Sequence, residues 1–165
     1  MRVTFLLLVS SLILFSGCST RGNPTYTKRV QQPKTTYFKT DNDFVKSALL
    51  KEYKKWKGTP YRYGGDSFRG VDCSSFIQQV YYDAFGIKIP RTTKQQAKIG
   101  YRVTKANSKS GDLIFFKTGY DTRHTGIIVE KDKFMHTSSK VGVTISSMYN
   151  PYWRSKFWKI KRVLP

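Results

Sequence analysis

One cysteine and two histidines are the side chains of this sequence that could perform nucleophilic catalysis together. Cys73 ends a glycine-punctuated loop over residues 64–72, and an apolar helical period begins just after it at Phe76. Asp72 stands where an N-cap is expected, so Cys73 would lie at the positive end of a helix dipole. That setting favours thiolate over thiol. The sequence therefore predicts a cysteine ready to act as a nucleophile.

Histidine suits the partner role, because it can accept a thiol proton and return it to a leaving amine near neutral pH. The chain has two histidines, His124 and His136, and both lie in runs of strand-forming residues. If these runs are neighbouring antiparallel strands joined by a turn at residues 130–133, the two rings share one end of the hairpin. One ring could then meet Cys73 while the other orients it, which is a triad by role. The spacing alone is equally consistent with two structural histidines.

A metal site is the further alternative for these three residues. One thiolate and two imidazoles, without another nearby cysteine or an acidic cluster, make a poor zinc site. We expect neither a metal nor another cofactor.

Hydrophobic periodicity predicts the elements that must position these side chains. Helices are predicted over residues 44–56 and from Cys73 to Gly86, where a glycine often ends a helix, and a short helix within residues 91–100. The period then becomes strand-like. The predicted strands are residues 113–116, 125–129, 134–137, 141–145 and 157–164. Helices first and a strand meander second indicate an α+β fold, with N-terminal helices packed on an antiparallel β-sheet.

The N-terminal residues resemble an export signal. Residues 1–17 combine an early arginine, an apolar run and a small-residue end, as in a bacterial secretion signal. The run that ends at Cys18 resembles the lipobox of bacterial lipoproteins, which implies lipidation of the Cys18 thiol. Ser19 next to it resembles an outer-membrane sorting signal, which implies a protein anchored there and facing the periplasm. Ordinary signal cleavage with a free Cys18, or a Cys18–Cys73 disulfide, are the alternatives.

Composition divides the rest of the chain and limits its partners. Residues 18–40 are polar and basic without apolar periodicity, which predicts a flexible tether, and residues 41–165 form one folded domain. The formal net charge is +20. The export signal and the absence of a nucleic-acid motif argue against a nucleic-acid partner. An exported basic protein is better matched to anionic cell-wall peptides, lipopolysaccharide or lipid headgroups. We expect a monomer.

Six short motifs occur in an order and spacing that resemble the NlpC/P60 family of cell-wall endopeptidases, particularly its lipoprotein type. The motifs are residues 56–65, 70–74, 90–92, 111–113, 123–127 and 136–138. The resemblance covers residues 46–164. It implies a papain-like α+β fold and a Cys–His–His triad, in which Cys73 is the nucleophile, His124 the general base and acid, and His136 the residue that orients His124.

The resemblance also suggests residues that bind the substrate. Tyr61 matches a tyrosine whose hydroxyl helps to bind the oxyanion, with the backbone N–H of Cys73 as the natural second donor. Asp72 and Ser74 match substrate-contacting positions, although helix capping and a first-turn hydrogen bond would also explain them. Ser75 replaces the usual glycine of the family, which puts substrate specificity in question.

The implied reaction is amide hydrolysis through an acyl-thioester in the stem peptides of peptidoglycan. The bond that the resemblance suggests joins the γ-carboxyl of D-glutamate to L-lysine or meso-diaminopimelate, and the crosslink between D-alanine and diaminopimelate is a second candidate. Two other functions stay open from the sequence. The protein could be a catalytically silent wall-binding lipoprotein, or it could transfer an acyl or peptidyl group to an amine with the same thiol.

Overall fold

The computed structural model describes residues 41–165, so the predicted signal peptide (1–17) and the Cys18 tether (18–40) lie outside the described residues. The helices are α1 (Asn42–Trp56), α2 (Cys73–Phe85), α3 (Thr93–Gln96) and α4 (Pro151–Lys156). The strands are β1 (Asp66–Ser67), β2 (Gly70–Val71), β3 (Tyr101–Val103), β4 (Leu113–Lys117), β5 (Arg123–Glu130), β6 (Lys133–Ser138), β7 (Gly142–Ser147) and β8 (Phe157–Arg162). Within residues 41–165, no helix has the length and apolar character needed to cross a membrane.

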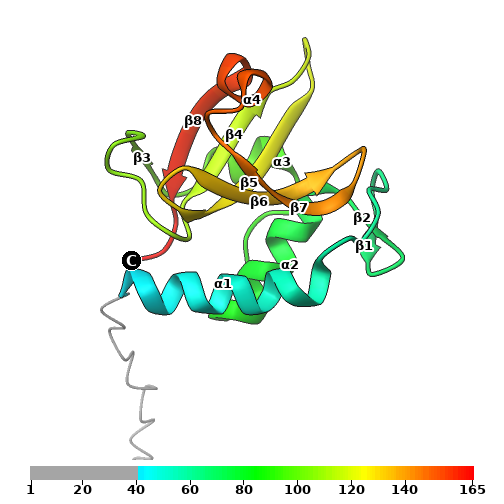
Figure 1. Cartoon of the computed structure of the whole chain (residues 1–165), viewed down its shortest axis with the longest axis horizontal. Coiled ribbons are helices and arrows are strands. Elements are labelled where there is room, and N and C mark those ends of the chain that lie inside the picture. Colours follow the sequence, from blue (N-terminus) through cyan, green and yellow to red (C-terminus); the bar gives the residue numbers. More distant parts are fainter. Residues whose placement is uncertain (1–40) are drawn as a thin grey trace, which may run out of the picture. The chain divides into compact units, whose positions relative to one another are not determined.

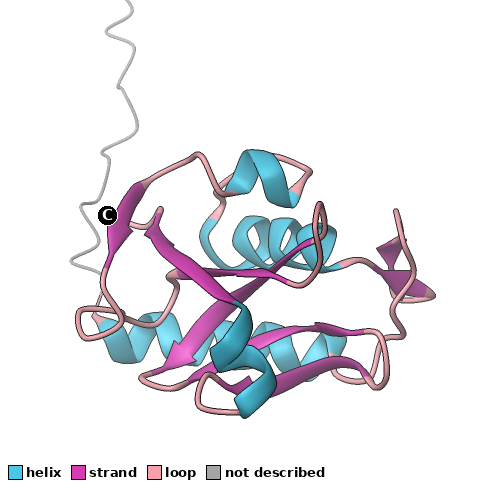
Figure 2. Cartoon of the chain, turned by 90° about the horizontal axis from the view of Figure 1, so that it is seen from above, coloured by secondary structure: helices cyan, strands magenta, loops and turns pink. Residues whose placement is uncertain are grey.

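Six strands form one antiparallel sheet in the order β3-β8-β4-β5-β6-β7, and β1 and β2 form a separate two-stranded ribbon. Strands β4 to β7 form a meander, and β8 returns to pair with β4 (Figure 1). Helices lie on both sides of the sheet (Figure 2). The predicted α+β architecture, with N-terminal helices against an antiparallel sheet, is confirmed.

The two long helices begin and end where local chemistry predicts. Asp72 caps α2 by accepting a hydrogen bond from the Ser75 amide at 2.8 Å, and Gly86 ends it in the left-handed region at φ 68°. Asp41 caps α1 in the same way. Helix α3 is shorter than the predicted range of 91–100: it has one turn, and Thr92 caps it.

The core consists of two apolar clusters, one on each face of the sheet. The first lies between the sheet and the helices α1 and α2, and the second lies on the opposite face under Trp153 of α4. Side chains of β4 alternate between the clusters, so all four of its apolar residues are buried. The central members of the first cluster are Leu49, Phe76, Ile77, Val80, Leu113, Phe115, Ile127 and Met135. Those of the second are Ile114, Phe116, Ile128, Phe134 and Ile160.

Sequence periodicity missed several short elements. Helix α4 is six residues long and begins at Pro151 after the N-cap Asn150, and strand β3 has three residues. Neither is long enough to show a period, and both are fixed by packing or pairing with distant residues. The last strand also ends at Arg162, two residues before the predicted end.

Strands β5 and β6 stop pairing with each other at Ile127 and Met135. Beyond that point β5 pairs with β4, and β6 pairs with β7. Gly126 lies at this transition. A Cβ atom there would lie 2.6 Å from the Phe134 ring and 2.8 Å from the Met135 carbonyl oxygen. The close approach of the two strands therefore requires glycine at this position.

We expect Gly126→Ala to lower the free energy of unfolding by about 1–3 kcal/mol, because the added methyl group overpacks a site bounded partly by backbone. Urea denaturation monitored by circular dichroism measures this loss. Gly119→Ala is the control, since a Cβ there would meet only the Thr122 side chain in an exposed turn. Equal stability of the two variants would contradict the close approach.

Candidate active site

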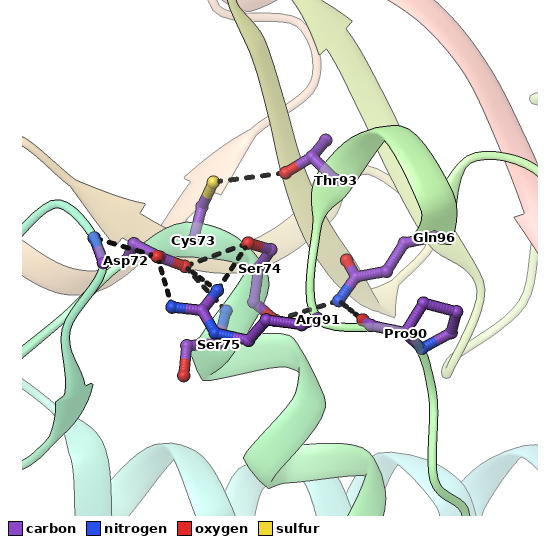
Figure 3. A network of polar contacts seen from close by, with 9 residues as sticks. Asp72, Cys73, Ser74, Ser75, Pro90, Arg91, Thr93 and Gln96 are labelled. Carbon is purple, nitrogen blue, oxygen red and sulfur yellow. Dashed lines mark hydrogen bonds and ion pairs between the residues drawn. The ribbon is translucent and has the colours of Figure 1, made fainter.

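The Cys73 side chain occupies the first turn of α2 and is buried between α3 and β5. Its sulfur lies 3.7 Å from the hydroxyl oxygen of Thr93 (Figure 3). The backbone amides of Thr125 and Ser74 also act on the sulfur as hydrogen-bond donors. The thiol is therefore surrounded by donors from three elements that are far apart in the sequence.

Burial raises the pKa of the Cys73 thiol, and the negative charge of Asp72 acts in the same direction. The hydrogen bonds from Thr93, Thr125 and Ser74 favour the thiolate but do not outweigh burial. The prediction that the helix start would favour thiolate over thiol is therefore wrong for the free protein. The physical reason is that the folded structure removes the sulfur from water, which the local sequence could not reveal.

The Asp72 carboxylate is the centre of a polar network at the start of α2 (Figure 3). It accepts hydrogen bonds from the Ser75 amide, the Ser74 hydroxyl and the Gly64 amide at 2.8, 3.0 and 3.1 Å. Both carboxylate oxygens also accept from the Arg91 guanidinium, at 3.0 and 2.7 Å. Burial disfavours the ionised carboxylate, but the hydrogen bonds outweigh it and lower the pKa of Asp72. Asp72 is thus a helix cap and an ion-pair partner at once.

Sequence reasoning missed the roles of Arg91, Thr93 and Gln96. Arg91 pairs with Asp72 and also donates to the Ser74 hydroxyl at 3.1 Å. The Gln96 amide group donates to the carbonyls of Ser74 and Pro90 at 2.9 and 2.8 Å. These hydrogen bonds and the ion pair therefore hold the loop before α3 against the start of α2. The available signal was the motif at residues 90–92, which indicated a family position but no contact.

The two histidines form a hydrogen-bonded pair. His124 Nε2 lies 3.0 Å from His136 Nδ1, and His136 Nε2 lies 2.9 Å from the hydroxyl oxygen of Ser146. His124 Nδ1 makes no hydrogen bond within residues 41–165. The expectation that the two rings share one end of the β5–β6 hairpin is confirmed. Ser146 is an additional partner that the sequence did not indicate.

Strand β5 joins the histidine pair to the thiol. Thr125, whose amide donates to the Cys73 sulfur, directly follows His124 in the chain. Thr125 beside the sulfur and His124 are therefore consecutive residues of β5, whereas no hydrogen bond joins the Cys73 sulfur to either imidazole within residues 41–165.

Trp153 of α4 covers the histidine pair. Its ring stacks on His124 with centroids 5.1 Å apart and an interplanar angle of 27°, and it meets His136 edge-on at 4.9 Å. Burial lowers the pKa of His124 to about 3 and that of His136 to about 4. A positive charge on His136 also acts to lower the pKa of His124. Both imidazoles are therefore neutral at pH 7, and His124 can accept a proton.

Tyr61 lies close to the same site. Burial raises the pKa of its phenol, and the negative charge of Asp72, or of Cys73 when it is ionised, raises it further, so the hydroxyl stays protonated and can donate. A backbone bridge to Val71 holds Tyr61 beside the loop that leads into α2.

All six predicted site residues of the folded domain lie in this region: Tyr61, Asp72, Cys73, Ser74, His124 and His136. The lipidation site predicted at Cys18 lies outside the described residues. Within residues 41–165, no group of three or more histidine, cysteine or acidic side chains could hold a metal ion.

Comparison with known proteins places this geometry in a family. The model of the NlpC/P60 family matches residues 58–162. A Haemophilus influenzae protein described as "Probable endopeptidase" is 42% identical over 163 residues, which cover 97% of this chain and 97% of that protein. An Escherichia coli protein described as "Murein DD-endopeptidase MepS/Murein LD-carboxypeptidase" is 42% identical over 120 residues, which cover 73% of this chain and 64% of that protein.

A solved structure agrees with the sequence matches. The crystal structure of an NlpC/P60 family protein from Bacillus cereus superposes with a TM-score of 0.65 at 30% identity, over 73% of this chain and 40% of that one. The chain thus spans less than two thirds of the E. coli and B. cereus proteins, whereas it spans nearly all of the H. influenzae protein. Since the family model matches more than half of its residues, the chain belongs to the NlpC/P60 family of cysteine peptidases and has the papain-like α+β fold of that family.

Proposed function

We propose that this protein is a peptidoglycan endopeptidase that hydrolyses amide bonds in stem peptides through an acyl-thioester on Cys73. The observation that most supports this proposal is the arrangement of the thiol and the two imidazoles. The buried Cys73 sulfur meets the Thr125 amide, and the preceding residue, His124, is hydrogen-bonded to His136 with its Nδ1 left unpaired within residues 41–165. The similarity to an E. coli murein endopeptidase supports peptidoglycan as the substrate.

In the first half of the reaction, His124 Nδ1 takes the proton from the Cys73 thiol as the sulfur attacks the amide carbonyl carbon. A base is needed because burial raises the pKa of the thiol. The carbonyl oxygen becomes an oxyanion, which accepts hydrogen bonds from the Cys73 amide and the Tyr61 hydroxyl. The carbon–nitrogen bond then breaks, the proton on His124 passes to the leaving amine, and a thioester remains.

In the second half, water attacks the thioester while His124 Nδ1 takes one of its protons. The carbon–sulfur bond breaks, the stem peptide leaves with a new carboxyl group that loses its proton to water, and the proton on His124 returns to the Cys73 sulfur. The enzyme is thus restored without a cofactor.

The tautomers of the histidine pair follow from this role. His124 must keep Nδ1 unprotonated, so its Nε2–H donates to His136 Nδ1. His136 then carries its proton on Nε2 and donates it to the Ser146 hydroxyl oxygen. His136 and Ser146 therefore hold His124 in the tautomer that can accept the thiol proton.

Asp72 and Ser74 are proposed to act near the substrate as well. Asp72 already accepts five hydrogen bonds, so its main contribution is to fix the start of α2 and the Arg91 guanidinium. A contact of Asp72 or Ser74 with the substrate amine remains a prediction, as does the effect of Ser75 on specificity. The D-glutamyl–diaminopimelate bond is the proposed target.

The N-terminal residues are proposed to anchor the enzyme. In this scheme residues 1–17 are removed as a signal, Cys18 carries the lipid, and residues 19–40 connect it to the catalytic domain at the outer membrane, on its periplasmic side.

Cys18→Ala should move the protein from the membrane fraction to the soluble periplasmic fraction on cell fractionation. Retention in the membrane fraction would contradict the anchor.

Cys73→Ala should reduce the release of stem fragments from purified sacculi by at least about a thousandfold, because the acyl-thioester cannot form. Mass analysis of the released fragments measures this, and an unchanged melting temperature shows that the variant is folded. Full activity of the variant would refute the mechanism. Sacculus binding without any release by the unaltered protein would instead indicate a silent wall-binding lipoprotein. Coupled products with an added amine would indicate a transferase.

The acid limb of the pH profile of kcat/KM should lie well below pH 6.5. Activity requires neutral His124, and it is lost as the pH falls through the lowered His124 pKa. Trp153→Ala should move this limb upward by about one pH unit or more, because it exposes the ring to water and so lessens the desolvation that lowers the pKa.

Trp153→Phe, which keeps an aromatic cover, should leave the acid limb in place and serves as the control. An acid limb that is the same in Trp153→Ala as in the unaltered protein would show that Trp153 does not shield His124.

A further inference from the structure

A group of cations surrounds the Trp158 ring at the end of β4 and β5. The charged groups of Lys117, Arg123 and Lys159 lie 5.5, 5.7 and 4.1 Å from the ring centre, which are cation–π distances. Trp158 is itself held edge-on against buried Phe115 at 6.4 Å. We call Trp158 and its three cations the Trp158 patch.

The strand register places the Trp158 patch beside the thiol. Phe115 pairs with Thr125, and Phe115 belongs to the core cluster under α2. Two residues along the same strands, Lys117 pairs with Arg123 and therefore shares that face of the sheet. The patch thus begins about 7 Å from Thr125 along β5. The Thr125 amide is the one that donates to the Cys73 sulfur.

The positive charge continues away from the thiol across β8 toward β3, the edge strand that pairs with it. A groove of about 290 Å³ is lined there by Arg102, Thr104, Lys105 and Lys159, with Val103 and Phe157 as its apolar residues. Lys159 belongs to both the groove and the patch. The distance from β5 across β4 and β8 to β3 is about 14 Å, at about 4.8 Å per strand. An extended peptide of four or five residues has about this length.

No carboxylate of residues 41–165 forms an ion pair with a cation of the patch or the groove. Burial lowers the pKa of Lys159, and the positive charges of Lys161 and Arg102 lower it further. The fold therefore holds these positive charges close to one another without a carboxylate of the domain to neutralise them. An anionic ligand would relieve their repulsion, and carboxylates are the complementary groups for lysine and arginine donors.

We propose that the Trp158 patch is a carboxylate-binding subsite for the part of the stem peptide next to the bond that is cut. The proposal rests on the peptidoglycan endopeptidase function proposed above, since stem peptides contain free carboxylates on glutamate and diaminopimelate residues. The subsite would make the enzyme prefer stems with free carboxylates over stems in which these groups are amidated.

The test compares a synthetic stem tripeptide of alanine, γ-linked D-glutamate and diaminopimelate with the same peptide carrying carboxamides. Calorimetry measures the Kd of each for Cys73→Ala protein, with and without Lys117→Gln/Lys159→Gln. The double replacement should weaken binding of the free-carboxylate peptide about three- to tenfold, as expected for the loss of two partly exposed charges. Binding of the amidated peptide should be unchanged. In the active enzyme the same replacement should raise KM and leave kcat unchanged.

Lys51→Gln/Lys54→Gln is the matched control, because it removes the same charge from exposed positions of α1. It should change neither Kd by more than about twofold. Arg123 is left intact in the test variant, since its guanidinium donates to the carbonyls of Gly119, Tyr120 and Thr122 and holds that turn. Equal effects of the double replacement on both peptides, or none on either, would overturn the subsite.

Two further outcomes separate the proposals. If the unaltered protein binds the free-carboxylate peptide preferentially through the patch but cuts no stem peptide, the endopeptidase function fails and the subsite stands. If the double replacement abolishes binding to phosphatidylglycerol vesicles but leaves the carboxylate preference intact, the patch contacts anionic lipid, and the subsite is overturned.

Discussion

The Asp72 carboxylate is the interaction on which the arrangement of this site depends. Its two oxygens accept hydrogen bonds from the loop before α2, from the first turn of α2 and from Arg91. A carboxylate can satisfy several donors only when they converge on it, so these segments are held in one relative position. Cys73 is the next residue in the chain, and its orientation therefore follows from the placement of the Asp72 carboxylate.

Burial sets the protonation states of the groups that would carry out catalysis. The same removal from water raises the pKa of Cys73 and lowers the pKa of His124 and His136, because the charged form of each group is penalised. The resting site therefore holds a neutral thiol and neutral imidazoles rather than a preformed ion pair. Hydrogen-bond donors around the sulfur and the relay to Ser146 are in place for the charge that develops when the proton moves.

The shortage of acidic residues explains the net positive charge of the chain. The sequence has ten acidic residues against thirty lysines and arginines. Asp72 and Asp112 are both buried, and each forms an ion pair with an arginine of the same domain. Carboxylates are thus too few to neutralise the surface, and the cations around Trp158 form no ion pair with a carboxylate of residues 41–165. Structural and surface electrostatics are thus two consequences of one composition.

The sequence by itself determined the helix starts, the order of the elements and the three chemically active side chains. These features depend on local rules, since Asp72 caps its own helix and Gly86 ends it. Only the tertiary structure decided that Arg91, Thr93, Ser146 and Trp153 surround those side chains. It also reversed the expected thiolate preference of Cys73. The physical reason is that contacts between distant residues and the loss of water on burial have no local pattern that periodicity or spacing can report.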